Sequence, residues 1–355
     1  MNRQILTTPQ GETYPIFTGA GLLDSLGGML ASIVKPCRVM ILTDSNVAPL
    51  YLDRAVQSMT ESGFAVTAKI LPAGEESKSI QKLSEVLEAF CEAHMTRTDL
   101  AVALGGGVIG DLTGFASGCY LRGIRFAQVP TTLLAAVDAS VGGKTAVNLE
   151  HGKNLAGLFH QPVAVICDTE TMKTLTPHEL ADGAAEAIKS GILGDPELFS
   201  VFESGEPAAQ LQEIVTRSVA FKAKIVMEDP NEHSVRKLLN LGHTPAHAIE
   251  LLSNFEISHG HAVAMGMGIM SRAAAKRKIL PQKAAERILD TLRRSNLPVN
   301  APFSAADMAK IAALDKKAAA NDITVILPET IGHCRMEKIP LAALEALFAD
   351  GTGEA

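Results

Sequence analysis

Residues 100–111 read LAVALGGGVIGD, and this stretch decides the fold class. Residues 100–104 are a short apolar run, which predicts a buried strand. Three glycines follow directly and lead into a helical pattern. A strand, glycines and a helix in this order place backbone N–H groups at a helix N-terminus, where the phosphates of a nucleotide can bind. The spacing is not G-x-G-x-x-G, so the segment alone is equally consistent with a tight strand-to-helix turn.

Working outward, the same kind of apolar run predicts strands at residues 38–43 and 163–167, alternation predicts a strand at 64–71 before Pro72, and helical spacing predicts a helix at 79–94. Strands that alternate with helices indicate a parallel sheet covered on both faces. After about residue 175 the spacing is mainly helical, with one short strand at 324–327. We therefore expect an α/β protein, with a Rossmann-like domain at 1–175 and a mainly α-helical domain at 176–355.

Composition excludes several classes of function. The 355 residues carry a net charge of −7 without a basic run, only 4% are aromatic, and there is no Trp. Nucleic acids and anionic membranes are therefore poor candidate partners. No apolar stretch approaches bilayer length, and the first eleven residues lack the apolar segment of a signal peptide. Five dispersed cysteines without a Cys-x-x-Cys pair indicate reduced thiols. We expect a cytoplasmic protein.

Polar residues follow the predicted strands where nucleotides bind in open α/β sheets. Asp44 and Asn46 come after the first strand, and residues 74–78 (GEESK) come after the next. Two Gly-Lys pairs, at Lys144 and at Lys153 before Asn154, are suited to phosphate or carboxylate oxygens. Each feature alone is also consistent with an ordinary loop or a solvated surface lysine.

The second half contains a cluster typical of a metal site. Residues 240–250 read NLGHTPAHAIE and residues 258–261 read SHGH, so four of the ten histidines lie within 19 residues: His243, His247, His259 and His261. Imidazole suits zinc and related ions, and a catalytic zinc commonly has three protein ligands with an open position. Helix-capping or surface histidines are the alternative, which would suit a lone histidine better than a cluster.

A carboxylate ligand is expected from elsewhere in the chain. Glu186 lies in GAAEAIKSG (183–191), three residues before Lys189, so both share one face of a predicted helix. A surface ion pair is the alternative interpretation. The small, uncharged neighbours favour a packed face.

Together these segments resemble the 3-dehydroquinate synthase family, within the sugar-phosphate cyclases. The resemblance runs from about Asp44 to about Cys334. The motifs that carry it are GGGVIGDLTGF (105–115), VPTTLLAAVDASVGGKTAVN (129–148), GKN (152–154), ELADGAAEAIKSG (179–191), LLNLGHTPAHAIE (238–250) and DKKAAANDITVILP (315–328).

The resemblance implies a Rossmann-like NAD-binding domain, a helical metal-binding domain and a homodimer. It implies Zn²⁺ or Co²⁺ on Glu186, His243 and His259. The residues that it implies for NAD are Asp44, Asn46, Gly74, Glu75, Lys78, Gly107, Val108, Ile109, Gly110, Asp111, Thr131, Thr132, Lys144, Lys153, Thr171 and Thr174. Those that it implies for substrate and catalysis are Asp138, Lys144, Asn154, Lys189, Lys222, Arg236, Asn240, His247, Lys316 or Lys317, and Arg122 from a partner subunit.

The implied reaction converts a small sugar-acid phosphate, 3-deoxy-D-arabino-heptulosonate 7-phosphate, to 3-dehydroquinate and phosphate. It proceeds by NAD-mediated transient oxidation, phosphate elimination, reduction and an intramolecular aldol closure. The alternatives are another sugar-phosphate cyclase, such as a 2-deoxy-scyllo-inosose or valiolone synthase, a metal-dependent polyol dehydrogenase, and a non-catalytic NAD-binding regulator.

The chain departs from the family pattern at three points. His261 stands where most members have Glu, Pro245-Ala246 replaces a bulky residue and Gly, and Ser190 replaces a usual Tyr. The register of the motif selects His259 as the ligand and leaves His261 without an assigned role.

Overall fold

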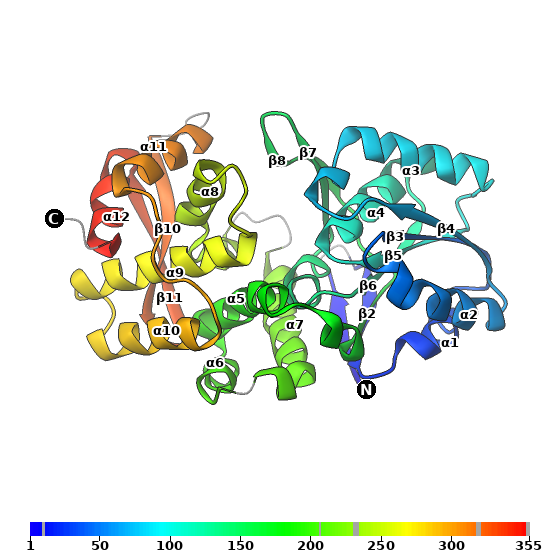
Figure 1. Cartoon of the computed structure of the whole chain (residues 1–355), viewed down its shortest axis with the longest axis horizontal. Coiled ribbons are helices and arrows are strands. Elements are labelled where there is room, and N and C mark those ends of the chain that lie inside the picture. Colours follow the sequence, from blue (N-terminus) through cyan, green and yellow to red (C-terminus); the bar gives the residue numbers. More distant parts are fainter. Residues whose placement is uncertain (9–10, 206, 230–233, 317–320, 353–355) are drawn as a thin grey trace. The chain divides into compact units, whose positions relative to one another are not determined.

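The structure, a computed structural model, describes residues 1–8, 11–205, 207–229, 234–316 and 321–352 (Figure 1). The chain forms two compact units. The first comprises Met1–Leu175 with Lys222–Pro230, and the second comprises Thr176–Phe221 with Asn231–Ala355. Lys222–Pro230 thus belongs to the first unit, although the sequence boundary near residue 175 would assign it to the second.

A seven-stranded sheet forms the centre of the first unit, in the order β1-β2-β9-β6-β5-β3-β4. All its neighbouring strands pair in parallel except β1 and β2. In chain order the strands are β1 (Asn2–Thr7), β2 (Thr13–Gly19), β3 (Arg38–Asp44), β4 (Ala65–Leu71), β5 (Leu100–Gly105), β6 (Arg125–Pro130) and β9 (Ala164–Asp168).

Helices cover both faces of this sheet (Figure 1). Successive side chains of a strand point to opposite faces, so Val39 and Ile41 of β3 pack in one apolar cluster with α1 (Leu26–Ala31) and α2 (Asp53–Glu61). Met40 and Leu42 pack in the other with α3 (Ile80–Glu92) and α4 (Gly107–Cys119). The continuous apolar runs are therefore strands buried on both faces, and the predicted α/β fold is confirmed.

The strand order brings four strand ends to one edge. β3 lies between β4 and β5, and β6 follows β5, all in parallel, so Asp44, Leu71, Gly105 and Pro130 end at the same edge. The chain moves outward from β3 to β4 and then returns to place β5 on the other side of β3. Such a reversal is the point at which open α/β sheets bind nucleotides.

Several strands were not predicted from the sequence. These are β1, β2, β6 and an antiparallel hairpin of β7 (Lys144–Leu149) and β8 (Gly152–Phe159). In the hairpin Leu155 and Phe159 are exposed, so its sequence lacks a buried face with a two-residue period.

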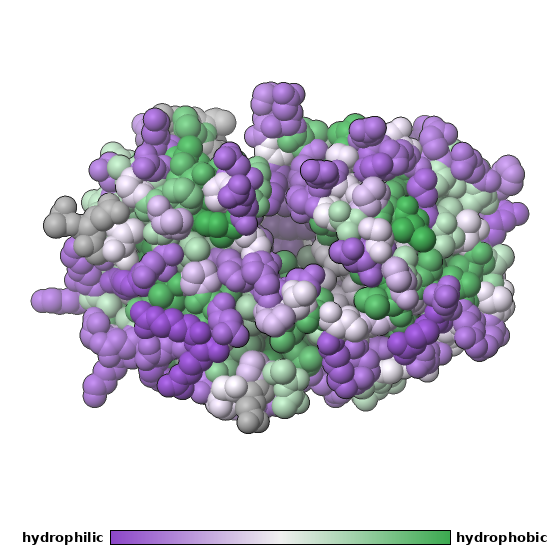
Figure 2. Space-filling view, viewed as in Figure 1, coloured by the Kyte–Doolittle hydropathy of each residue, from purple (hydrophilic) through white to green (hydrophobic). Residues whose placement is uncertain are grey.

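Hydrophilic residues spread over the visible face of each unit, with smaller apolar areas between them (Figure 2).

The second unit is mainly helical, as predicted. Its helices are α5 (Pro177–Gly194), α6 (Pro196–Glu203), most of α7 (Leu211–Glu228), α8 (His243–Leu252), α9 (His259–Lys276), α10 (Gln282–Arg294), α11 (Ala305–Lys316) and α12 (Leu344–Thr352). The late strand predicted at 324–327 is confirmed as part of β10 (Asp322–Thr330), but its antiparallel partner β11 (His333–Pro340) was not predicted. None of the described helices combines the length and apolarity needed to cross a membrane.

Helix α9 is the central element of the second unit and packs against α5, α8, α10 and α12 (Figure 1). Three of its glycines face the backbone of a neighbouring segment. A Cβ on Gly266 would lie 2.0 Å from the carbonyl oxygen of Gly242, the residue that precedes α8. The absence of a side chain at this position therefore sets how closely α8 approaches α9.

We expect Gly266→Ala to lower the free energy of unfolding by about 1–3 kcal/mol, because the added methyl group would overpack this contact. Gly28→Ala is the matched control, since Gly28 lies in α1 with nothing within 4 Å of the point that an added methyl group would occupy, and it should be neutral or stabilising by up to about 1 kcal/mol. Urea unfolding of both variants measures the difference. Equal stabilities would contradict the proposed close contact.

Candidate metal centre and nucleotide edge

Glu186 lies deep within helix α5. The helix starts at a capping box in which Thr176 and Glu179 each bond the other's backbone N–H, as predicted from TPHE. Ten residues into the helix, Glu186 is only 1% exposed and forms an ion pair with Lys189, itself 3% exposed. The pair is therefore buried, as the small neighbouring residues indicated, and is not a surface ion pair.

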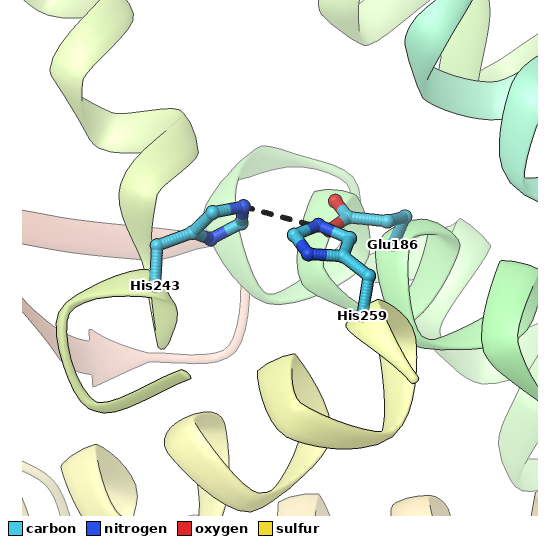
Figure 3. Close-up of side chains that lie close together, drawn as sticks. All are labelled: Glu186, His243 and His259. Atoms are coloured by element: carbon cyan, nitrogen blue, oxygen red, sulfur yellow. Dashed lines mark ion pairs between the residues drawn. The ribbon is translucent and has the colours of Figure 1, made fainter. Parts of the chain in front are cut away.

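Two imidazoles meet this carboxylate from two other helices. His243 is the first residue of α8 and His259 the first of α9. Their Nε2 atoms lie 3.6 Å and 3.4 Å from Oε1 of Glu186. Both rings point toward the carboxylate (Figure 3). Helix starts carry both histidines because Gly242, with φ +78°, reverses the chain before α8, and Ser258 is the N-cap residue of α9.

The geometry of these three residues fits one divalent ion. Their ligand atoms all lie within 4.8 Å of one another. In a tetrahedral zinc site with bonds of about 2.0–2.1 Å, two ligand atoms lie about 3.4 Å apart, close to the distances seen here. Neither Glu186 oxygen, although buried, accepts a hydrogen bond of regular geometry from the described residues. A buried carboxylate that faces two imidazoles in this way matches the donor set of a catalytic zinc.

The charges of the cluster are set by burial and by its neighbours. Burial alone would raise the pKa of Glu186, but Lys189 and the two imidazoles hold it well below the usual range. Burial and the charge of Lys189 lower the pKa of His243 to about 3. Burial also acts to lower the pKa of His259, but Glu186 and Glu250 raise it to about 10. These shifts leave His243 neutral and Glu186 ionised, whereas His259 must release a proton before its Nε2 can bind an ion.

Glu250 is a contributor that the sequence did not reveal. It lies on α8, seven residues after His243, is 5% exposed, and accepts from Nδ1 of His259 at 3.4 Å. A carboxylate behind a metal-binding imidazole fixes its tautomer and leaves Nε2 for the ion. The sequence NLGHTPAHAIE does not indicate a role for its final glutamate, because the contact between Glu250 and His259 depends on how α8 packs against α9.

Other predicted residues of the second unit lie close by in sequence. Arg236 and Asn240 are on the 3₁₀ helix η8 (Val235–Asn240), and Arg236 is 2% exposed. His247 is one turn beyond His243, with ring centroids 5.7 Å apart. Lys316 is the last residue of α11, and Lys317 lies outside the described residues.

The predicted nucleotide residues of the first unit gather at the shared edge of its sheet. Asp44 ends β3, and its Oδ1 accepts the backbone N–H groups of Asn46 and Val47. Gly106 is the N-cap residue of α4 and provides no side-chain cap. The helix then begins at this edge with the residues Gly107, Val108, Ile109 and Gly110. Thr131 and Thr132 follow β6. These positions agree with the crevice that binds dinucleotides in open α/β sheets.

An ion pair and a short chain of hydrogen bonds tie the loops at this edge together. Lys78, only 8% exposed, contacts Asp111 at 2.5 Å, although burial still raises the pKa of Asp111. Asn148 donates to Glu75 at 2.7 Å, and its Oδ1 accepts the backbone N–H of Asn154 at 2.9 Å. Asn148 was not predicted as a site residue, and it links the loop after Gly74 to the β7–β8 hairpin.

The remaining predicted residues occupy four further places in the first unit. The ammonium group of Lys222 donates to the backbone carbonyl of Asp138 at 2.6 Å and to Oδ1 of Asp138 at 2.7 Å. Thr171 and Thr174 follow β9, and both contact the hydroxyl of Tyr51. Lys144 begins β7 and Lys153 lies in β8. Arg122 lies in a turn in which Leu121, Arg122 and Gly123 all have positive φ, a strained run typical of functional loops.

Comparison with known proteins places the chain in a family. The 3-dehydroquinate synthase N-terminal model matches residues 68–182, and the C-terminal model matches residues 183–318. The chain belongs to the 3-dehydroquinate synthase family. It is 40% identical over 337 residues to the 3-dehydroquinate synthase of Caldanaerobacter subterraneus subsp. tengcongensis, covering 93% of this chain and 95% of that relative.

Two further comparisons agree with membership of the family. The chain is 41% identical over 345 residues to the 3-dehydroquinate synthase of Rhizobium leguminosarum bv. trifolii, covering 93% of this chain and 92% of the relative. Among solved structures, 2-epi-5-epi-valiolone synthase of Streptomyces hygroscopicus subsp. jinggangensis 5008, with NAD⁺ and Zn²⁺ bound, aligns with a TM-score of 0.88 at 26% identity, covering 99% of each chain.

We expect Glu250→Gln to weaken zinc binding about 10- to 100-fold, because the neutral amide no longer holds the His259 tautomer as strongly. Glu256→Gln is the matched control, since Glu256 is an exposed glutamate three residues before His259. Competition with a chromophoric chelator measures both affinities. Wild-type affinity in Glu250→Gln would show that this carboxylate does not support the site.

Proposed function

We propose that this protein converts 3-deoxy-D-arabino-heptulosonate 7-phosphate to 3-dehydroquinate and phosphate, using NAD and Zn²⁺ or Co²⁺. The observation that carries the proposal is the convergence of Glu186, His243 and His259 within 4.8 Å. It occurs in a chain that is 40% identical to a 3-dehydroquinate synthase over nearly its whole length. The valiolone synthase with NAD⁺ and Zn²⁺ bound supports the same cofactors.

The metal residues have a defined task in this reaction. A divalent ion, when bound there, supplies Lewis-acid chemistry that lowers the pKa of a sugar hydroxyl. Glu186 contributes a charge that Lys189 keeps ionised despite burial. The side chain of His259 is 32% exposed, whereas that of Glu186 is 1% exposed. The imidazole side of the cluster is thus the side accessible to a ligand.

Polar residues beside the metal cluster suit an anionic sugar acid. Arg236 has the planar, forked guanidinium that binds a carboxylate through two hydrogen bonds. Its place on η8, just before Gly242 and His243, keeps it in the same part of the second unit. His247 is one turn from His243 and carries an imidazole, the side chain that most often transfers protons in enzymes. We assign Arg236 and Asn240 to substrate binding and His247 to proton transfer.

The first unit is assigned to NAD, which supplies a temporary hydride acceptor. The helix start at Gly107 suits the pyrophosphate, and Asp44 at the end of β3 suits ribose hydroxyls. Lys144, Lys153, Asn154 and Lys222 supply cationic and amide donors for phosphate oxygens. Asp138 holds the ammonium group of Lys222 in place.

We further propose a cytoplasmic homodimer in which Arg122 reaches the phosphate bound by a neighbouring subunit. The run of positive φ values around Arg122 supports a constrained loop with a task beyond local folding. The activities of other sugar-phosphate cyclases are less well supported, because the chain is 40% identical to a 3-dehydroquinate synthase but only 26% identical to a valiolone synthase.

We expect the purified protein to release phosphate from 3-deoxy-D-arabino-heptulosonate 7-phosphate. Phosphate release should cease when a chelator removes the metal and should return when Zn²⁺ or Co²⁺ is added. His243→Ala should lower kcat by about a thousandfold or more, since the Lewis acid is worth several kcal/mol. His333→Ala, with a side chain that is 68% exposed, is the control. Full activity of the chelated protein would refute the metal role, and release from a different sugar phosphate alone would identify another cyclase.

We expect NAD to be required only in catalytic amounts, because the hydride taken in the first step returns to the substrate. Absorbance at the NADH wavelength should stay nearly flat while phosphate accumulates. A polyol dehydrogenase would instead produce NADH in step with product. A regulator would bind NAD without any turnover.

A further inference from the structure

Helix α9 begins at a metal-site residue, but its own N-cap side chain does not cap it. Ser258 is in the N-cap position, and its hydroxyl makes no hydrogen bond to the helix backbone. Instead, Ser258 Oγ donates to Oδ1 of Asp182 at 2.6 Å. The start of α9, and therefore the position of His259, depends on a side chain from outside the helix.

Asp182 supplies the missing cap from helix α5. Its Oδ1 accepts the backbone N–H of His261 at 3.0 Å and lies 3.1 Å from Nδ1 of His261. A carboxylate at a helix N-terminus is stabilised by the helix dipole as well as by these bonds. The Asp182 side chain is only 14% exposed, so the contact is shielded from water.

The two helix backbones touch at the same place. A Cβ on Gly260 would lie 2.0 Å from the carbonyl oxygen of Asp182, so only glycine lets α9 approach α5 this closely. The contact leaves little room for α9 to slide or rotate on α5. His259 is the residue directly before Gly260, and its ring must reach Glu186 from this fixed point.

Asp182 also belongs to a row of residues that ends at the metal site. His178, Asp182 and Glu186 recur every four residues along α5 and therefore share a face. His178 stacks on the ring of His261, with centroids 4.1 Å apart. Asp182 caps α9, and Glu186 lies 3.4 Å from Nε2 of His259. The row contacts the first turn of α9 residue by residue, so it sets the distance between two of the three candidate ligands.

We propose that Asp182 is a positioning residue of the metal centre, which, together with His261, holds the first turn of α9 so that His259 meets the ion beside Glu186. This inference rests on the proposed function, because it presumes an ion at Glu186, His243 and His259. It also gives His261, which the family pattern leaves unexplained, a role as the partner of Asp182.

The test compares zinc affinity and the visible absorption of bound Co²⁺ in the full-length protein and three variants. Asp182→Ala should weaken zinc binding about 10- to 100-fold and change the Co²⁺ spectrum, as loss of an outer-shell partner does. Asp182→Asn keeps an oxygen acceptor at Oδ1 and should stay within about threefold of wild type. Asp195→Ala removes the cap that Asp195 gives to α6 at Leu198 N, at 2.9 Å, and should keep wild-type affinity and spectrum.

Asp195→Ala separates positioning from a general loss of stability, because it removes a helix cap worth about 1 kcal/mol of unfolding free energy, and an ion pair with Arg217, away from the metal cluster. Wild-type zinc affinity and Co²⁺ spectrum in folded Asp182→Ala would overturn the inference, as would equal losses in Asp182→Ala and Asp195→Ala. If Asp182→Ala does not fold, Ser258→Ala serves as the test variant. We expect its zinc affinity to fall at least about threefold, and wild-type zinc affinity in this variant would contradict the inference. Absence of zinc binding by the wild type would instead overturn the proposed function itself.

Discussion

The second unit is organised around one buried negative charge, the carboxylate of Glu186. An unpaired carboxylate in such a place would be strongly destabilising, and a group without partners would take up a proton instead. Lys189 from the same helix and the imidazoles of His243 and His259 prevent this. The same charge that the fold must compensate is the one that a divalent ion would require. Stability and metal binding therefore depend on the same four side chains.

Holding two imidazoles at one carboxylate requires three helix segments to be fixed to within a fraction of an ångström. Glycine makes this possible, because Gly266 lets the start of α8 touch α9 and Gly260 lets α9 touch α5. Buried acidic side chains then lock the contacts. Glu250 links α8 to the ring of His259, and Asp182 links α5 to the backbone beyond it. The candidate metal centre is thus a product of helix packing, and its three candidate ligands come from three separate helices.

The sequence predicted those parts of the fold that depend on local pattern. Continuous apolar runs identified β3, β5 and β9, and TPHE identified the start of α5, because these signals are contained within a few residues. The edge strand β1 and the β7–β8 hairpin were missed, since strands with many exposed residues and mixed polarity resemble loops in a single sequence. The largely buried β2 and β6 were missed because polar residues, Pro or Gly interrupt their apolar runs. The resemblance to a known family selected Glu186, His243 and His259 in advance. Glu250, Asn148 and Asp182 could not be selected, because each acts on another element through a contact that depends on how the elements pack.

The proposed chemistry depends above all on one ion bound by a carboxylate and two imidazoles of this chain. X-ray absorption at the metal edge of the zinc- or cobalt-loaded protein tests this most directly. We expect two imidazole ligands, with oxygen or nitrogen donors at about 2.0–2.1 Å and no sulfur, and the loss of one imidazole in His259→Ala. A first shell with fewer than two imidazoles in the wild-type protein, or one containing sulfur, would contradict it.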